Sequence, residues 1–305
     1  MDRITKDLLE QVADLHDIPV GAYNIRKDGQ LLGRNVSANI EIVTKTDKPG
    51  IDIIIKDNTV KESVHIPVII AQSGLKEAVY NDFFIGENCD VTIIAGCGIH
   101  NGGKDASEHS GIHSFDVGKN SKVKYVEKHY GQGEGTGERI MNPTTKILLR
   151  EGSYMEMDTV QIEGIDSTKR DTSARVLDNA TLVIKEKIMT HGKQLAETNF
   201  SVELDGENCG TNLISRSVAK DESHQIFVSE INGNNACHGH SECDAIIMDN
   251  ASVKALPALT ANHVDASLIH EAAIGKIAGE QLIKLMTLGL TEEEAEKEIV
   301  SGFLK

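Results

Sequence analysis

The chain has 305 residues, of which 39% are hydrophobic and 26% are charged, and its formal net charge is −16. A surface this negative repels phosphate backbones and anionic lipid, which argues against nucleic-acid and membrane partners. No stretch approaches the roughly 18 uncharged apolar residues of a membrane span, and the N-terminus lacks a signal-type apolar stretch. Five cysteines, an odd number spread thinly, are no disulfide framework, so we expect a cytoplasmic protein with reduced thiols.

The first 75 residues predict a helix followed by short strands. Four apolar residues in the first 16 fall on one helical face: Ile4, Leu8, Val12 and Leu15. Asp28-Gly29 separates two short β-type segments and is typical of a tight hairpin turn. Apolar runs at 51–55 and 64–70 have the length of strands. We therefore treat residues 1–75 as an N-terminal helix and β-hairpin region.

Residues 76–266 repeat one turn phrase between short alternating segments, and no convincing helical pattern appears between residues 81 and about 266. The phrase places Asn or Gly, which tolerate positive φ, before a small residue and then a strand. It recurs at residues 85–89, 117–121, 149–153, 177–180, 205–209 and 248–251. The steps between its markers are 32, 32, 27, 29 and 42 residues, counted on Asn88, Asn120, Gly152, Asn179, Asn208 and Asn250.

An irregular period with one turn signature per step favours a solenoid whose strands stack on one another. The aromatic content of 4% favours it too, because a narrow β-helix interior takes stacked Val, Ile and Leu more easily than rings. The alternative is a β-sandwich with similar hairpins. We predict a mainly-β protein with a parallel β-helix core over residues 76–266.

Residues 267–305 are predicted to form a C-terminal helical domain. A helical stripe is formed by Ile274, Ile277, Leu282, Leu285 and Met286. Gly289 is suited to a C-cap, and Thr291 with Glu294 forms a capping box that opens a last helix. That helix carries Ala295, Ile299 and Phe303 on one face. The two helices either cap the solenoid or dock a partner.

Residues 237–244 have the densest concentration of metal-binding side chains. They are Cys237, His238, His240, Glu242, Cys243 and Asp244. The composition suits soft or borderline metals, but the Cys-x5-Cys spacing matches no standard zinc site. In a strand, the two cysteines would face one side and the histidines and acids the other, so they could not all converge on one ion. The alternative is a buried Cys with solvated neighbours.

Two further positions attract attention. Cys97 ends an apolar strand between two glycines, where a buried inert thiol is the default interpretation. His270-Glu271 lacks the second histidine of a zincin, because residue 274 is Ile, and such a lone pair is usually structural.

The combined motifs resemble the SufB/SufD family, the scaffold proteins of the SUF iron–sulfur cluster assembly machinery. The matching segments, in order, are 241–244, 268–277, 280–282, 289–295 and 299–303. A shorter match covers residues 93–97 and 118–126. The resemblance spans about residues 60–305, and the chain looks like the compact form of minimal SUF systems.

The resemblance implies a right-handed parallel β-helix with a C-terminal helical domain. Family members pair through their cores and dock a SufC-like ABC ATPase, two copies per complex, on the C-terminal helices. The residues here that correspond to this docking region are Leu290, Thr291, Ile299 and Phe303. The cluster, 4Fe–4S or 2Fe–2S, forms transiently at the core interface and passes to apo-proteins. The scaffold itself is not an enzyme, and ATP hydrolysis belongs to the partner.

The same resemblance assigns roles by position. Cys243, Glu271 and His270 correspond to cluster ligands, and Cys97 corresponds to the cysteine that receives sulfur as a persulfide. Oxygen and nitrogen ligands would hold a cluster more weakly than four thiolates, which suits a protein that must release it.

The chain departs from the family pattern at two places. SufB usually has Glu-His-Glu where this chain has Ile269-His270-Glu271, and Cys237, His238, His240 and Asp244 become secondary metal or sulfur candidates. Cys243, Glu271 and His270 together favour a homodimer over pairing with a SufD-like subunit. The sulfur donor (a cysteine desulfurase or sulfide) and the binding of reduced flavin stay open. The alternatives are a cytosolic β-helix carbohydrate-active enzyme and a SufD-like supporting subunit that binds no cluster itself.

Overall fold

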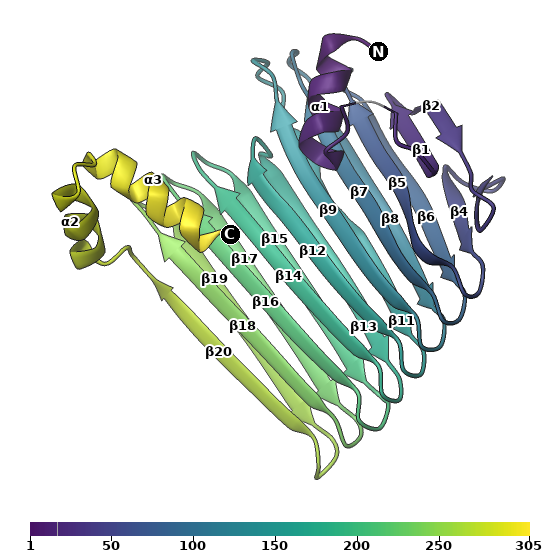
Figure 1. Cartoon of the computed structure of the whole chain (residues 1–305). Coiled ribbons are helices and arrows are strands. Elements are labelled where there is room, and N and C mark those ends of the chain that lie inside the picture. Colours follow the sequence, from purple (N-terminus) through teal and green to yellow (C-terminus); the bar gives the residue numbers. More distant parts are fainter. Residues whose placement is uncertain (17) are drawn as a thin grey trace.

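A computed structural model describes residues 1–16 and 18–305. These described residues form two ten-stranded sheets, named here A and B, with one helix near the N-terminus and two at the C-terminus. Figure 1 shows their arrangement. Sheet A contains β1 (Ala22–Lys27), β2 (Gln30–Asn35), β5 (Val60–Ile70), β7 (Asp90–His100), β9 (Lys122–Gln132), β12 (Tyr154–Glu163), β14 (Thr181–Thr190), β16 (Gly210–Ala219), β18 (His238–Ile247) and β20 (Ser267–Gly275). Sheet B contains β3 (Ile40–Thr44), β4 (Gly50–Ile55), β6 (Lys76–Ile85), β8 (Ser107–Val117), β10 (Arg139–Met141), β11 (Thr144–Leu149), β13 (Ser167–Val176), β15 (Leu195–Leu204), β17 (His224–Gly233) and β19 (Ser252–Ala261).

From β4 onward the chain alternates between the two sheets, except that β10 and β11 follow one another in sheet B, and each strand pairs in parallel with the strand one turn away. The result is a parallel β-solenoid of about eight turns, which confirms the predicted fold class and excludes the sandwich. Inward positions alternate with outward ones along each strand, as in the pattern of β14, where every second residue is buried. The interior is mostly stacked Ile, Val, Leu and Phe.

The recurring turn phrase forms the corner where the chain passes from sheet B to sheet A. Its marker residues adopt the left-handed conformation that Asn and Gly tolerate, with φ of +55° at Asn88, Asn120, Asn179 and Asn208 and +67° at Gly152. Successive corners hydrogen bond to one another, as from Asn88 N to the Lys119 carbonyl at 2.9 Å. This turn chemistry therefore sets the solenoid corner.

The sixth phrase, at residues 248–251, was wrongly placed in this series. It lies at the opposite corner, between β18 and β19, and its left-handed residue is Asp249 (φ +57°) and not Asn250. The step of 42 residues is long because it joins two different corners. A tight turn of Asp, Asn and a small residue satisfies either corner, so the local sequence does not distinguish them.

Helix α1 (Arg3–Ala13) confirms the predicted amphipathic helix and packs on the outer face of sheet A over β5, β7 and β9. It buries Leu8 and Val12, and Asp2 caps its N-terminus. The contact is close: a Cβ on Gly96 of β7 would lie 2.2 Å from the Val12 carbonyl oxygen. Glycine at this position therefore permits the helix to lie against the sheet.

The C-terminal segment is only partly helical. Strand β20 occupies its first nine residues, so Ile274 and the His270-Glu271 pair lie in the sheet, although the hydrophobic pattern placed Ile274 in a helix. Helices α2 (Gly279–Thr287) and α3 (Glu292–Phe303) follow, and the predicted capping box of Thr291 and Glu294 is present. Among the residues described, no helix is long and apolar enough to span a membrane.

Candidate functional site

A column of buried polar side chains runs through the interior along sheet A. The strand register stacks Glu127, Thr159, Glu186, Ser215 and Cys243 on five successive strands, and each is 3% exposed or less. We call these five residues the buried column. Polar groups in a hydrophobic core cost free energy unless they are hydrogen bonded, so a continuous line of them indicates a functional site more than a stabilising one.

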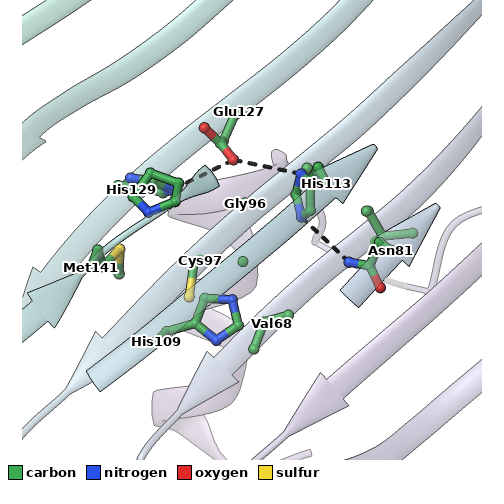
Figure 2. Close-up of a pocket in the computed structure, with 13 residues that line it drawn as sticks. Val68, Asn81, Gly96, Cys97, His109, His113, Glu127, His129 and Met141 are labelled. Carbon is green, nitrogen blue, oxygen red and sulfur yellow. Dashed lines mark hydrogen bonds and ion pairs between the residues drawn. The ribbon is translucent and has the colours of Figure 1, made fainter. Parts of the chain in front are cut away.

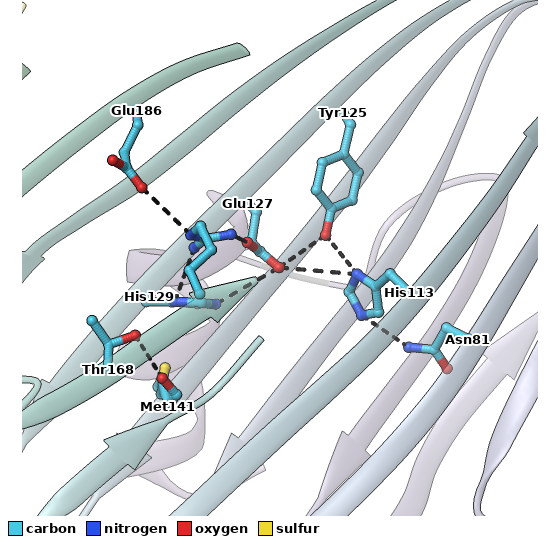
Figure 3. Close-up of polar contacts among 9 residues, drawn as sticks. Asn81, His113, Tyr125, Glu127, His129, Met141, Thr168 and Glu186 are labelled. Carbon is cyan, nitrogen blue, oxygen red and sulfur yellow. Dashed lines mark hydrogen bonds and ion pairs between the residues drawn. The ribbon is translucent and has the colours of Figure 1, made fainter. Parts of the chain in front are cut away.

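Arg170 from sheet B lies between two carboxylates of the buried column, Glu127 and Glu186. Figure 3 labels both carboxylates. Arg170 Nη1 lies 2.5 Å from Glu127 Oε2, and its Nε lies 3.7 Å from Glu186 Oε1. Burial raises the pKa of Glu127, but Arg170 together with His129 and His113 outweighs burial and holds that pKa well below its usual range. At Glu186, burial has the larger effect and raises the pKa, although Thr198 and Ser215 donate hydrogen bonds to this carboxyl. The interior thus holds an ion pair beside a carboxyl with a raised pKa.

A second set of polar contacts extends from Glu127 across to sheet B (Figure 3). Tyr125 donates its hydroxyl proton to Glu127 at 2.9 Å, and His113 Nδ1 lies 2.7 Å from the same hydroxyl. Burial lowers the pKa of His113 to about 4, so its ring is neutral near pH 7. Asn81 Nδ2 lies 3.3 Å from His113 Nε2, while Asn81 Oδ1 is buried without a partner.

Cys97 lies at the other end of this polar interior, beside a cavity of about 20 Å³ (Figure 2). The thiol is 3% exposed, and burial raises its pKa well above the usual value. Cys97 pairs in register with His129, in the column next to the buried column. Five strand spacings separate the strands of Cys97 and Cys243, about 24 Å at roughly 4.8 Å per strand.

The predicted cluster ligands are divided between the two faces of sheet A. In the pairing of β18 with β20, Ser241 opposes His270, Glu242 opposes Glu271, and Cys243 opposes Ala272. Cys243 and His270 therefore lie on the inward face, and Glu271 lies on the outward face, where its Oε2 is 3.9 Å from His240 Nε2. Burial raises the pKa of the Cys243 thiol to about 12. The Nδ1 atom of His270 is buried without a hydrogen-bond partner.

The secondary candidates follow the alternation expected of a strand. Cys243 points inward, and His238, His240, Glu242 and Asp244 occupy the outward positions of β18. Cys237 precedes the strand and is 5% exposed. Within the part of the chain that the structure describes, no three His, Cys, Asp or Glu side chains converge closely enough to hold a metal ion. A single chain therefore does not present a preformed cage.

The residues suggested for partner docking lie at the C-terminal helices. Ile299 and Phe303 line a groove of about 750 Å³ between α3 and the end of sheet A, together with Ile274 and Ile277. Thr291 is exposed at the start of α3, and Leu290 is half-buried.

Sequence reasoning missed Glu127, Arg170 and Glu186. A signal was present, because each occupies an inward position of an alternating strand. Glu127 lies two residues from Tyr125 and Glu186 lies two residues from Ile184, whereas the inward neighbours of Arg170 are Thr168 and Thr172. The inward–outward alternation along each strand predicts that these charged side chains lie inside, but it does not predict which of them form ion pairs with one another.

The fold and this interior define a β-solenoid with a buried path of thiols, carboxylates and imidazoles. Residues 73–303 match the SUF system FeS cluster assembly, SufBD core domain, and the chain belongs to this family. The family gives the chain a role in iron–sulfur cluster assembly, which confirms the resemblance seen in the sequence and leaves the carbohydrate-active alternative without support.

Several iron–sulfur cluster assembly SufBD family proteins are similar to this chain. One from Pyrococcus horikoshii is 29% identical over 297 residues, covering 91% of this chain and 89% of the relative. One from Methanocaldococcus jannaschii is 28% identical over 254 residues, covering 83% of this chain and 79% of the relative. A Synechocystis relative is 26% identical over 205 residues, 65% of this chain but 43% of the longer relative.

Proposed function

We propose that this protein is the scaffold on which an iron–sulfur cluster is assembled from sulfur and iron and then released to apo-proteins. Sulfur enters at Cys97 and travels inside the solenoid to Cys243. The observation that carries this proposal is the buried column, a line of polar side chains that leads from the neighbourhood of Cys97 to Cys243. An interior lined in this way keeps sulfane sulfur away from water and from reductants.

Cys243 and His270 serve as cluster ligands, and Glu271 completes the set. Their division between two faces of sheet A supports assembly at an interface between two solenoids, because one chain alone brings no three of its ligands together. The buried, unpartnered His270 Nδ1 supports the same arrangement. Strand β20 ends sheet A, so a second copy of this chain meets it edge to edge in a homodimer.

Energy for opening this interface comes from a SufC-like ABC ATPase, two copies of which dock on α2 and α3. The groove beside Ile299 and Phe303 supports docking at this end, next to β20. ATP binding in the partner moves the helices and biases the core between two states, which is what coupling between distant sites requires. The scaffold itself catalyses no reaction, and it works in the cytoplasm.

The direct test is anaerobic reconstitution of the full chain with ferrous iron and sulfide, with and without the ATPase partner. We expect bound iron, acid-labile sulfide and a sulfur-to-iron charge-transfer band for the wild type, and loss of all three for Cys243→Ser. Cys89→Ser is the matched control, because Cys89 is equally buried but lies at a corner of the opposite end.

Two outcomes would change the proposal. Equal binding by wild type and Cys243→Ser would remove Cys243 from the ligand set and move Cys237, His238 and His240 forward. Absence of iron in every sample would make the chain a SufD-like supporting subunit that binds no cluster itself. Flavin is tested in the same samples by its absorbance after reduction.

A further inference from the structure

A buried carboxylate–histidine pair lies next to the Cys97 thiol. His109 Nδ1 is 3.2 Å from Glu77 Oε1, and Arg26 Nη2 is 3.4 Å from Glu77 Oε2. Burial raises the pKa of Glu77, but its contacts with His109 and Arg26 outweigh burial and lower that pKa, so Glu77 is a carboxylate. A carboxylate accepts a hydrogen bond from Nδ1–H, which leaves His109 Nε2 as the basic nitrogen.

His109 and Cys97 line the same small cavity (Figure 2). The cavity exists because residue 111 is glycine: a Cβ there would lie 3.4 Å from His109 Nε2 and 3.2 Å from His113 Nε2. A volume of about 20 Å³ accommodates one water-sized atom. Asn81 lines the same space, and its Oδ1 is buried without a partner.

We propose that His109 is the general base for Cys97 when this thiol receives sulfane sulfur, that Glu77 is its positioning residue, and that the cavity at Gly111 holds the added sulfur atom. This inference rests on the proposed function, in which Cys97 is the sulfur acceptor. A base is needed there because a buried thiol stays protonated at neutral pH, and the thiolate is the nucleophile.

The transfer balances without an oxidant. His109 Nε2 takes the proton from Cys97, and the thiolate attacks the outer sulfur of a donor persulfide, R–S–SH. The new bond joins Cys97 Sγ to that sulfur, the S–S bond of the donor breaks, and R–S⁻ leaves with the bonding electrons. His109 returns the proton to R–S⁻, so the products are a Cys97 persulfide and R–SH.

The test incubates the full chain anaerobically with cysteine persulfide and follows one added sulfur on the Cys97 peptide by mass spectrometry. We expect His109→Gln to slow the addition about 100-fold at pH 7, within the range for loss of a general base. The rate in this variant should then rise about tenfold per pH unit with the thiolate fraction, while the wild-type rate levels off. Glu77→Gln should slow it less and keep the wild-type form of the profile.

Other charged groups could affect this profile, and controls separate them. The titratable or charged groups that line the cavity or contact its base are Arg26, Glu77, His113, Glu127 and His129, and Arg170 pairs with Glu127. His65→Gln changes a partly buried histidine of sheet A outside the cavity and should leave the rate unchanged. Gly111→Ala, at a position without positive φ, should keep the pH profile and lower the final persulfide occupancy, because its methyl group fills the cavity.

The outcomes separate the two proposals. Equal rates and equal pH profiles in wild type and His109→Gln would overturn the role of His109 and leave Cys97 as the sulfur acceptor. Absence of sulfur from wild-type Cys97, with other cysteines modified, would overturn the acceptor role itself. Circular dichroism of each variant establishes that the solenoid is folded. If His109→Gln does not fold, the rate and pH profile of Glu77→Gln carry the test.

Discussion

Replacing Arg170 by Met tests whether the interior charges are a paired unit. Arg170 is the buried cation that faces both Glu127 and Glu186. Removing it leaves a carboxylate in the core without its counter-ion, and breaking a buried pair in this way typically costs about 3–5 kcal/mol. The double variant Arg170→Met/Glu127→Gln removes the orphaned charge, so it should recover most of that loss.

In the Arg170→Met variant, the contribution of the Glu127 carboxyl to the pH dependence of stability should have the opposite sign from that in the wild type. In the wild type, Arg170 holds the folded-state pKa of Glu127 below its unfolded value, so the pair stabilises above the unfolded pKa of about 4.3 and this contribution is lost as pH falls through the folded pKa. Without Arg170, burial dominates and raises the folded-state pKa. The folded state then binds more protons than the unfolded state, so the stability of the variant should fall as pH rises above about 4.3.

Urea unfolding followed by far-UV circular dichroism at pH 5 and pH 8 measures both effects. The single variant should lose more stability at pH 8 than at pH 5, and the double variant should show little difference between them. Equal unfolding midpoints for single and double variants at both pH values would refute the assignment of Glu127 as a buried, charge-paired carboxylate.

Three other predictions concern helix α1, a solenoid corner and helix α3. Gly96→Ala should displace α1, because the added Cβ would approach the Val12 carbonyl oxygen to 2.2 Å, and limited proteolysis should then cut the N-terminus faster. Asn120→Ala should lower the unfolding free energy by about 1 kcal/mol at a left-handed corner, whereas Asn120→Gly should be close to neutral; equal effects would contradict the corner's φ of +55°. Thr291→Ala removes the capping box with Glu294 and should cost α3 about 1 kcal/mol, seen as faster amide exchange in its first turn.

The β-helix and its corners were predictable because the responsible preferences are local. Alternation of buried and exposed residues sets each strand, and Asn or Gly at positive φ sets each corner, so a short window of sequence is enough for either. The same local information could not tell one corner from the other at Asp249, nor separate strand from helix at Ile274, where apolar residues fit both periods.

The candidate site depends on which side chains of successive solenoid turns lie above one another. Residues far apart in the chain, such as Glu127 and Arg170, become an ion pair only because one turn of the solenoid sets the register of the next. Register also put Cys243 and His270 on the inward face and Glu271 outside. The strand alternation, the corner chemistry and the family resemblance can all be recognised from the amino-acid sequence, since each depends on short-range order. Which side chains share the interior depends on the folded solenoid, because turns of unequal length leave the register to be set by non-local packing.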